Sequence, residues 1–226
     1  MLRGVATLDQ ADPPRDPPRP ARGRRVARAS GDERERAILE TAERLLAERP
    51  LSEISVDELG RGAGISRPAF YFYFPSKDAV VLTLIERMVE EGAARKDEAL
   101  AGLAEDPRGR LRQGLQDYYD IFHARRAVVL AGVELRASNA EARALWAQIM
   151  EGWVRDVAAI IESERARGAA PAGLPARELA IALLQMNERV HNAAFARESP
   201  ALREQDVVDV LLEIWLHAIY GSAAPA

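Results

Sequence analysis

Cysteine is absent from the 226-residue chain, and histidine occurs only three times. Without cysteine the chain has no disulfide scaffold, no thiolate ligand for a metal and no thiol nucleophile. The histidines, His123, His191 and His217, are scattered and show no metal-ligand spacing. Neither the G-x-S-x-G motif of hydrolases nor a phosphate-binding P-loop occurs. We therefore predict that the chain is not an enzyme and that it holds neither a metal nor another cofactor.

Long apolar runs are missing as well. No stretch approaches the roughly 18 apolar residues that cross a membrane as a helix. The charged, proline-rich N-terminus lacks the apolar segment of a secretory signal. Hydrophobic residues make up 48% of the chain and charged residues 29%, which is ordinary for a globular protein. The sequence therefore predicts a cytoplasmic protein.

The net charge of −4 shows no excess of positive charge overall, but positive charge gathers in the N-terminal third of the chain. Residues 1–31 carry seven arginines against three aspartates, together with five prolines. We predict that this segment is a disordered arm. It is either an extension without a function or a basic arm that attracts phosphate groups non-specifically. Residues 60–77 contribute Arg61, Arg67 and Lys77 without any acidic residue.

Apolar residues recur at helical spacing from residue 32 to the C-terminus. One helix stops before Pro50, and Ser55 with Glu58 forms the capping-box pattern that begins a short helix at about 56–62. Further helices are expected at about 66–73, from Ser76 onward, and at about 108–123, 126–136, 139–167, 175–197 and 203–220. The predicted fold class is all-α, with about nine helices.

Aromatic residues form only 6% of the chain, yet five stand side by side at residues 70–74, as FYFYF. As a strand, this run would lack a partner strand, and Pro68 and Pro75 bracket it, so a helix is the consistent interpretation. Five consecutive helical residues cover more than a full turn and cannot all face one core. We expect Phe70 and Phe74 to pack inside and the other aromatic side chains to be offered to a partner.

Two short helices separated by a turn that contains Gly64 predict a helix-turn-helix, which points to nucleic acid. Ser55 and Ser66 can cap the two helices, and backbone amides at helix starts suit phosphate oxygens. Lys77 is a further phosphate candidate. The candidate DNA-binding residues are Ser55, Ser66, Arg67, Pro68, Ala69, Tyr71, Phe72, Tyr73 and Lys77.

The segment from Ile54 to Met88 resembles the DNA-binding domain of TetR-type transcriptional regulators. The resemblance is carried by GISR at residues 64–67, by FYFYF and by KDAV at residues 77–80. Within this family the chain is similar to EthR-type repressors, whose features recur in Trp146, Met150, Trp153 and in MNER at residues 186–189.

The resemblance implies that residues 66–73 are a recognition helix in the major groove of double-stranded DNA. Pro68 and Ala69 are then expected near base edges, and the phosphate contacts would come from Ser55, Arg67, Tyr71, Tyr73 and Lys77. Apolar contacts with thymine methyl groups and DNA shape would carry much of the specificity. One short helix reads few base pairs, so a homodimer on a near-palindromic operator is expected.

The resemblance also implies a ligand-binding and dimerisation domain at residues 79–221, after a helix-turn-helix domain at residues 32–78 and before a tail at residues 222–226. A tunnel for a small apolar ligand would be lined by Leu111, Tyr118, Phe122, Trp146, Met150, Trp153, Asn187 and Trp215. Asn187 is the polar group expected to hold a ligand carbonyl or amide. Whether Asp156, where relatives carry other groups, faces the tunnel is left open. From spacing alone, the stripe of Trp146, Met150 and Trp153 is more often core.

The last two helices carry broad apolar faces, which the resemblance assigns to the dimer interface. These faces comprise Leu179, Leu183, Met186, Val190, Val207, Val208, Leu211, Leu212 and Ile219. A core buried within one chain is the other interpretation. The predicted function is a repressor that a small apolar ligand releases from its operator. The alternatives are a helical carrier of small molecules and a DNA-binding regulator without an inducer.

Overall fold

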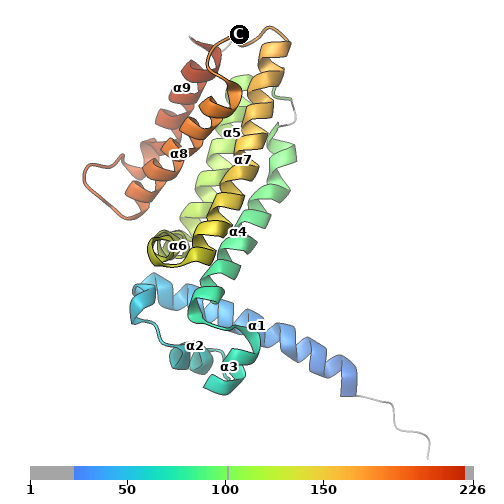
Figure 1. The fold of residues 1–226 in the computed structure, drawn as a ribbon, viewed down its shortest axis with the longest axis vertical. Coiled ribbons are helices and arrows are strands. Elements are labelled where there is room, and N and C mark those ends of the chain that lie inside the picture. Colours follow the sequence, from blue (N-terminus) through green and yellow to red (C-terminus); the bar gives the residue numbers. More distant parts are fainter. Residues whose placement is uncertain (1–22, 101, 222–226) are drawn as a thin grey trace, which may run out of the picture.

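Nine α-helices make up the part of the chain that the computed structural model describes, residues 23–100 and 102–221. Of residues 23–30 and 95–100 only the backbone is described. These ranges contain no strand, so the predicted all-α fold class is confirmed, and the aromatic run is helical through Tyr73. A small N-terminal domain lies at one end of the molecule and a helical bundle at the other (Figure 1).

The helices lie close to the expected positions. Their bounds are α1 Gly23–Glu48, α2 Val56–Gly62, α3 Arg67–Tyr73, α4 Lys77–Leu100, α5 Pro107–Ala124, α6 Arg126–Ser138, α7 Ala140–Ala166, α8 Ala176–Phe195 and α9 Val207–Tyr220. Short 3-10 helices, η1 Leu51–Glu53 and η2 Glu204–Asp206, precede α2 and α9. The expected arm at residues 1–31 overlaps α1, because that helix begins at Gly23. Residues 1–22 and the tail at residues 222–226 lie outside the described residues.

Helices α2 and α3 are positioned by the local signals that their sequence carries. The Ser55 hydroxyl accepts a hydrogen bond from the Glu58 backbone N–H, and the Glu58 carboxylate accepts one from the Ser55 N–H at 2.9 Å. The Ser66 hydroxyl likewise accepts from the Ala69 N–H. Gly64 joins the two helices with φ of 69°, a left-handed conformation that glycine adopts without strain. The turn and both caps hold α3 at the edge of the domain.

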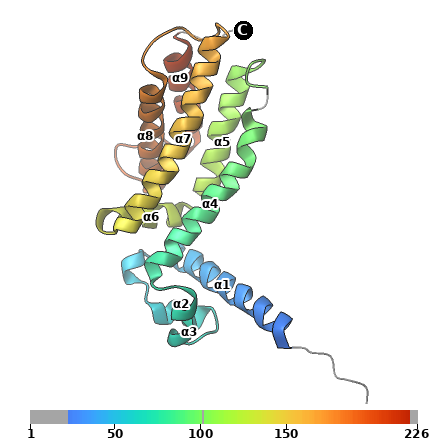
Figure 2. The same ribbon diagram turned by 45° about the vertical axis from the view of Figure 1, so that its right-hand side comes forward.

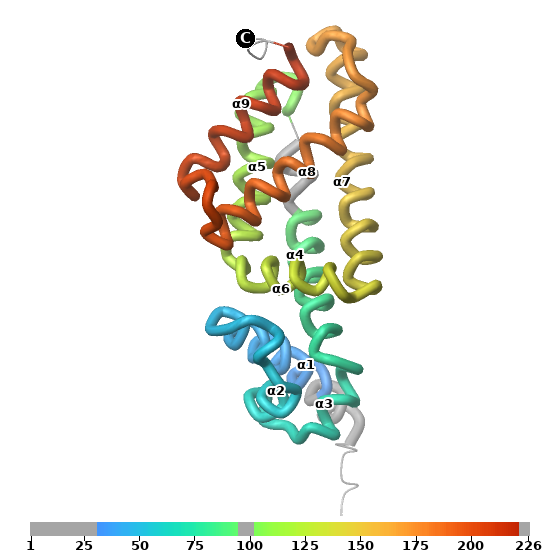
Figure 3. The backbone as a smooth tube through the Cα atoms, turned by 60° about the vertical axis from the view of Figure 1, so that its left-hand side comes forward, coloured from blue at the N-terminus to red at the C-terminus, as the bar shows by residue number. Residues whose placement is uncertain are grey.

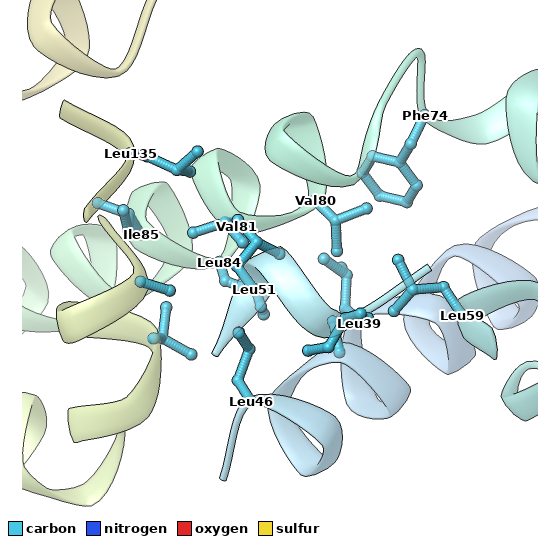
Figure 4. Close-up of a cluster of buried hydrophobic side chains, with 14 of the residues drawn as sticks. Leu39, Leu46, Leu51, Leu59, Phe74, Val80, Val81, Leu84, Ile85 and Leu135 are labelled. Carbon is cyan, nitrogen blue, oxygen red and sulfur yellow. The ribbon is translucent and has the colours of Figure 1, made fainter. Parts of the chain in front are cut away.

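Phe70 and Phe74 anchor α3 on its inner side, as predicted. They are 0% and 5% exposed, and their rings lie 6.1 Å apart. The core that receives them is formed by α1, α2 and α4, with Leu39, Leu59 and Val80 among its members (Figure 4). Tyr73 is half-buried against the same core, whereas Tyr71 and Phe72 are exposed, so two of the five aromatic side chains face outward.

Helix α4 connects the two parts of the molecule, and α6 lies across the end of the bundle next to α1 (Figures 2 and 3). The N-terminal core continues into α6 through Val128 and Leu135, which share it with Ile85 of α4. The approach is close at Gly132 of α6, where a Cβ would lie 2.6 Å from Ile85 Cδ1. The N-terminal domain is therefore packed against α6 through α1, as well as joined to the bundle by α4.

Helices α5, α7, α8 and α9 form the bundle, around a second core that includes Ile161, Leu211 and Leu216. The residues of this core include most of those that were expected to form the dimer interface. Seven of the nine residues assigned to them are buried within one chain, namely Leu179, Leu183, Val207, Val208, Leu211, Leu212 and Ile219. Met186 and Val190 are half-buried against the same core. Val210 and Ile214, on the opposite side of α9, are exposed at 36% and 41%.

Candidate nucleic-acid interface and ligand cavity

The outer side of α3 presents an unusual apolar surface. Phe72 is 84% exposed and Tyr71 46%, whereas apolar side chains of this size are mostly buried in the described chain. Pro68 is also exposed, while Ala69 and Tyr73 are half-buried. Large exposed aromatic side chains that lie together mark interaction sites. The structure thus presents Pro68, Tyr71 and Phe72 as one surface at the end of the molecule away from the C-terminus (Figure 1).

Arg67, the first residue of α3, is held by two neighbours. Its Nη1 donates to Asp57 Oδ2 of α2 at 2.9 Å. Its guanidinium carbon lies 5.9 Å from the centre of the Tyr71 ring. The nearby Tyr71 side chain and the Asp57 carboxylate raise the pKa of Arg67. Arg67 is therefore a fixed cation at the start of the exposed surface. Asp57 had not been expected to take part, although it stands ten residues before Arg67 and two residues after the capping Ser55.

The two capping serines are already engaged. The Ser55 hydroxyl donates to Glu58 Oε2 at 2.7 Å besides accepting from the Glu58 N–H, and Ser66 accepts from Ala69. Both serines are exposed, and both hydroxyl groups serve the helix starts. Arg49 extends the first cap, because its Nη2 donates to Glu58 Oε1 at 2.6 Å. These contacts lower the pKa of Glu58 to about 2, the hydrogen bonds from Ser55 having the largest effect.

Lys77 differs from its expected role. Its ammonium group donates to the carbonyl oxygens of Leu51 at 2.6 Å and Ile54 at 2.8 Å, and lies 3.4 Å from that of Ser52. An ammonium has three N–H donors, so these carbonyls account for all of them. The structure corrects the expected phosphate contact: Lys77 fastens η1 to the first turn of α4.

A cavity of about 230 Å³ lies between α4, α5, α7, α8 and α9. Its wall is mainly apolar and aromatic, and α4 contributes Val89, Gly92 and Ala93. Six of the eight predicted ligand-binding residues line it: Leu111, Tyr118, Phe122, Trp153, Asn187 and Trp215. Asp156, whose direction the sequence left open, lines it too. Its volume lies below the roughly 300–1,000 Å³ of most ligand pockets, but its wall chemistry is that of a site for a small, largely apolar molecule.

The other two predicted ligand-binding residues, Trp146 and Met150, are not among the described residues that line this cavity. Both line a separate groove of about 780 Å³ on α6, α7 and α8. The Trp146 Nε1 donates to Glu188 Oε2 at 3.1 Å, and the Arg136 guanidinium carbon lies 4.5 Å from its ring centre. Trp146 meets the cavity wall through Trp153, against which it packs edge-on with ring centres 5.8 Å apart.

The cavity contains polar groups whose orientation is fixed. Trp215 Nε1 donates to Asn187 Oδ1 at 3.0 Å, and Asn187 is only 6% exposed. The Asn187 amide therefore has its NH₂ group left for a ligand. Buried His191 donates through Nδ1 to the backbone carbonyl oxygen of Asn187 at 2.6 Å and packs against Tyr118. Burial lowers the pKa of His191. A neutral imidazole thus supports the wall behind Asn187.

Arg110 and Asp117 also line the cavity, although sequence reasoning did not select them. They lie on one face of α5 with Gly114 and Ile121, at a spacing of i, i+4, i+7 and i+11, and this period could have identified them. Over residues 23–100 and 102–221, no helix is long and apolar enough to cross a membrane. Within the same limits, no cluster of three or more histidine or acidic side chains could hold a metal.

Comparisons with known families agree with this geometry. The family described as bacterial regulatory proteins, tetR family, matches residues 38–84. The family described as transcriptional regulator EthR, C-terminal domain, matches residues 111–221. The first match contains the helix-turn-helix, and the second spans α5, α6, α7, α8 and α9.

Individual relatives match over most of the chain. The HTH-type transcriptional regulator EthR of Mycobacterium tuberculosis is 52% identical over 205 residues, which cover 88% of this chain and 93% of that protein. EthR of Mycolicibacterium smegmatis is 47% identical over 204 residues, 90% of this chain and 94% of that one. Thermus thermophilus FadR, a TetR-family transcriptional repressor solved in complex with lauroyl-CoA, has a TM-score of 0.60 and 20% identity, covering 85% of this chain and 98% of its own.

Proposed function

Because the chain belongs to the TetR family of DNA-binding transcriptional regulators and is EthR-like within it, we propose that it is a repressor released from its operator by a small, largely apolar ligand. The observation that carries this proposal is the cavity of about 230 Å³ beside α4. Helix α4 follows α3 after three intervening residues and lines the cavity farther along, so one helix connects the cavity to the segment that carries the exposed aromatic surface. The protein acts in the cytoplasm, where the DNA is.

The exposed side of α3 would enter the major groove, with Pro68, Tyr71 and Phe72 against the bases and the sugar-phosphate backbone. Phe72 and Pro68 have no hydrogen-bonding side chain, so their base contacts are apolar and suit the methyl group of thymine. The Tyr71 hydroxyl can donate to a phosphate oxygen. Arg61, exposed near the end of α2 and without an ion pair in the described part of the chain, adds a cation for the phosphates.

A homodimer would place two such helices in successive major grooves of a near-palindromic operator. The exposed side of α9, with Val210 and Ile214, is the apolar surface in the bundle that supports this proposal. The apolar residues buried between α8 and α9 would then support the interface by packing within each subunit, and would not contact the partner subunit.

The ligand would be an elongated apolar molecule with a hydrogen-bond acceptor, because Asn187 offers its NH₂ group while Trp215 occupies its carbonyl oxygen. The acyl chain in the FadR complex has a related chemistry, although that protein shares the fold alone with this chain. A ligand that pushes on Gly92 and Ala93 would displace α4 and with it α3. Ligand binding changes DNA affinity only if the two arrangements of α4 bind the ligand unequally.

The first test is a fluorescence-anisotropy titration of the full chain with DNA from upstream of its own gene, at two salt concentrations. Sequence-selective, salt-dependent binding that falls about tenfold in Tyr71→Ala is expected. Leu174→Ala is the control, because Leu174 is exposed at 66% far from α3. Release of the DNA by long-chain acyl compounds or other apolar amphiphiles would support the inducer. Selective DNA binding that no such ligand reverses would favour a regulator without an inducer.

A further inference from the structure

Arg67 and Asp57 form an ion pair on the exposed surface of the helix-turn-helix, with 56% and 49% of their side chains accessible. An ion pair this exposed adds little to folding stability. It does hold the guanidinium in one place, because Asp57 Oδ2 fixes Nη1 at 2.9 Å and the guanidinium carbon lies 5.9 Å from the centre of the Tyr71 ring. The arrangement therefore orients Arg67 more than it stabilises the fold.

Neutralisation by Asp57 makes Arg67 a weak anchor for phosphate. A phosphate contact gains from net positive charge, and the paired carboxylate cancels much of the charge at this point. A base edge, in contrast, is recognised by the geometry of N–H groups. A guanidinium has five N–H donors in a planar fork, so donating one to Asp57 leaves enough for a bidentate contact.

The position of Arg67 suits a base contact as well. Residues at the beginning of a recognition helix face base edges in the major groove. Among the seven residues of α3, RPAFYFY, arginine is the one whose side chain can make a bidentate hydrogen-bond contact. The bidentate partner of arginine in the major groove is guanine, through O6 and N7.

We propose, on the basis of the proposed function, that Arg67 reads one guanine in each half-site of the operator and that Asp57 is its positioning residue. The α3 surface then combines one polar base contact with the apolar contacts of Pro68 and Phe72. The half-site carries a guanine beside positions at which a thymine methyl group is favoured.

The test is selection of duplexes from a random DNA library by the full chain, followed by titration of the selected duplex and of versions with the guanine replaced. The unmodified protein should select one conserved guanine per half-site. Arg67→Ala should lose about ten- to a hundredfold affinity for the guanine-containing duplex and lose its preference at that position. Preferences at the other positions should persist. Asp57→Asn should reduce the preference for guanine while strengthening binding to unrelated DNA, because it removes a negative charge.

Arg61→Ala is the matched control, since it removes an exposed arginine of the same domain. It should weaken all duplexes by a similar factor and leave the base preferences unchanged. If Arg67→Ala behaves in that way too, with a salt dependence reduced by about one phosphate contact, the base-reading role is wrong. If Asp57→Asn prefers guanine as strongly as the unmodified protein, Asp57 does not position Arg67. If the unmodified protein selects no sequence at all, the proposed function fails instead.

Discussion

Trp215 of α9 donates its indole N–H to the side-chain oxygen of Asn187 of α8 at 3.0 Å, inside the wall of the cavity. An indole can only donate, so this contact decides which end of the amide meets the ligand. The bond also joins the last two helices of the bundle. The same hydrogen bond therefore fixes which group of Asn187 can bind a ligand and helps to hold α8 against α9.

Trp215→Phe should lower stability and relax ligand selectivity. The buried Asn187 oxygen would lose its donor, at a cost of about 1–3 kcal/mol in the free energy of unfolding. The amide could then turn, so ligands with a hydrogen-bond donor should gain affinity relative to those with an acceptor. Urea denaturation and paired ligand titrations measure both effects. Unaltered selectivity in a folded variant would show that Asn187 does not contact the ligand.

Gly114→Leu should block the cavity. Gly114 lines it, and a Cβ at this position meets no atom within 4 Å. The leucine side chain would fill part of the cavity. The ligand concentration that releases half of the bound DNA should therefore rise at least tenfold. Gly152→Leu is the matched control, because Gly152 also lies in a helix with open space at its Cβ and does not line this cavity.

Both glycine variants should gain roughly 1 kcal/mol of helix propensity. Their difference in ligand response therefore isolates the filled cavity. A ligand response that is the same in Gly114→Leu and Gly152→Leu would place the ligand elsewhere, with the groove at Trp146 as the next site to examine.

Lys77→Met should destabilise the protein without changing the salt dependence of DNA binding. The ammonium bonds two carbonyl oxygens of η1 and its flank within 2.8 Å, and leaving them unpaired should cost about 1–3 kcal/mol. Arg61→Ala is the counterpart: it should change stability by less than about 0.5 kcal/mol and reduce the salt dependence. A clear fall in salt dependence for Lys77→Met would restore its phosphate role.

The cap of α2 should weaken in acid. The pKa of Glu58 falls from 4.5 to about 2 in the folded chain, so the unfolded chain binds its proton first as the pH drops. The stabilisation is present above pH 4.5 and is lost between pH 4.5 and about 2. Glu58→Gln should flatten the pH dependence of thermal unfolding in this window. An equally steep dependence in the variant would mean that other carboxylates dominate.

Local signals in the sequence predicted the helix-turn-helix closely, because capping and turn formation depend on neighbouring residues. Ser55, Ser66 and Gly64 act over three or four positions, and the helix bounds follow from them. The burial of Phe70 and Phe74 also followed, since their spacing of four places both on one side of a helix. The start of α1 at Gly23 was missed because the prolines at residues 13–20 and the seven arginines led all of residues 1–31 to be interpreted as one disordered arm.

Contacts between distant residues were not predictable in the same way. Lys77 bonds carbonyl groups 23 and 26 residues away, and its positive charge alone suggested a phosphate instead. Helix α9 is apolar on a wide face because it packs against both α5 and α8, and sequence alone does not separate that from a dimer interface. Trp146 and Trp153 lie on the same side of α7. Trp146 bonds Glu188 and lines the groove on α6, α7 and α8, whereas Trp153 lines the cavity.

The packing of α6 on α4 has a consequence for engineering chimaeric regulators. Val128 and Leu135 of α6 complete the core of the N-terminal domain, and Gly132 lets Ile85 approach at a distance that no larger residue permits. A DNA-binding domain cut at residue 78 would leave this core without one of its walls. Hybrids that exchange operator specificity between related proteins should therefore take α1, α2, α3, α4 and α6 from one parent, or rebuild the contact between the two domains residue by residue.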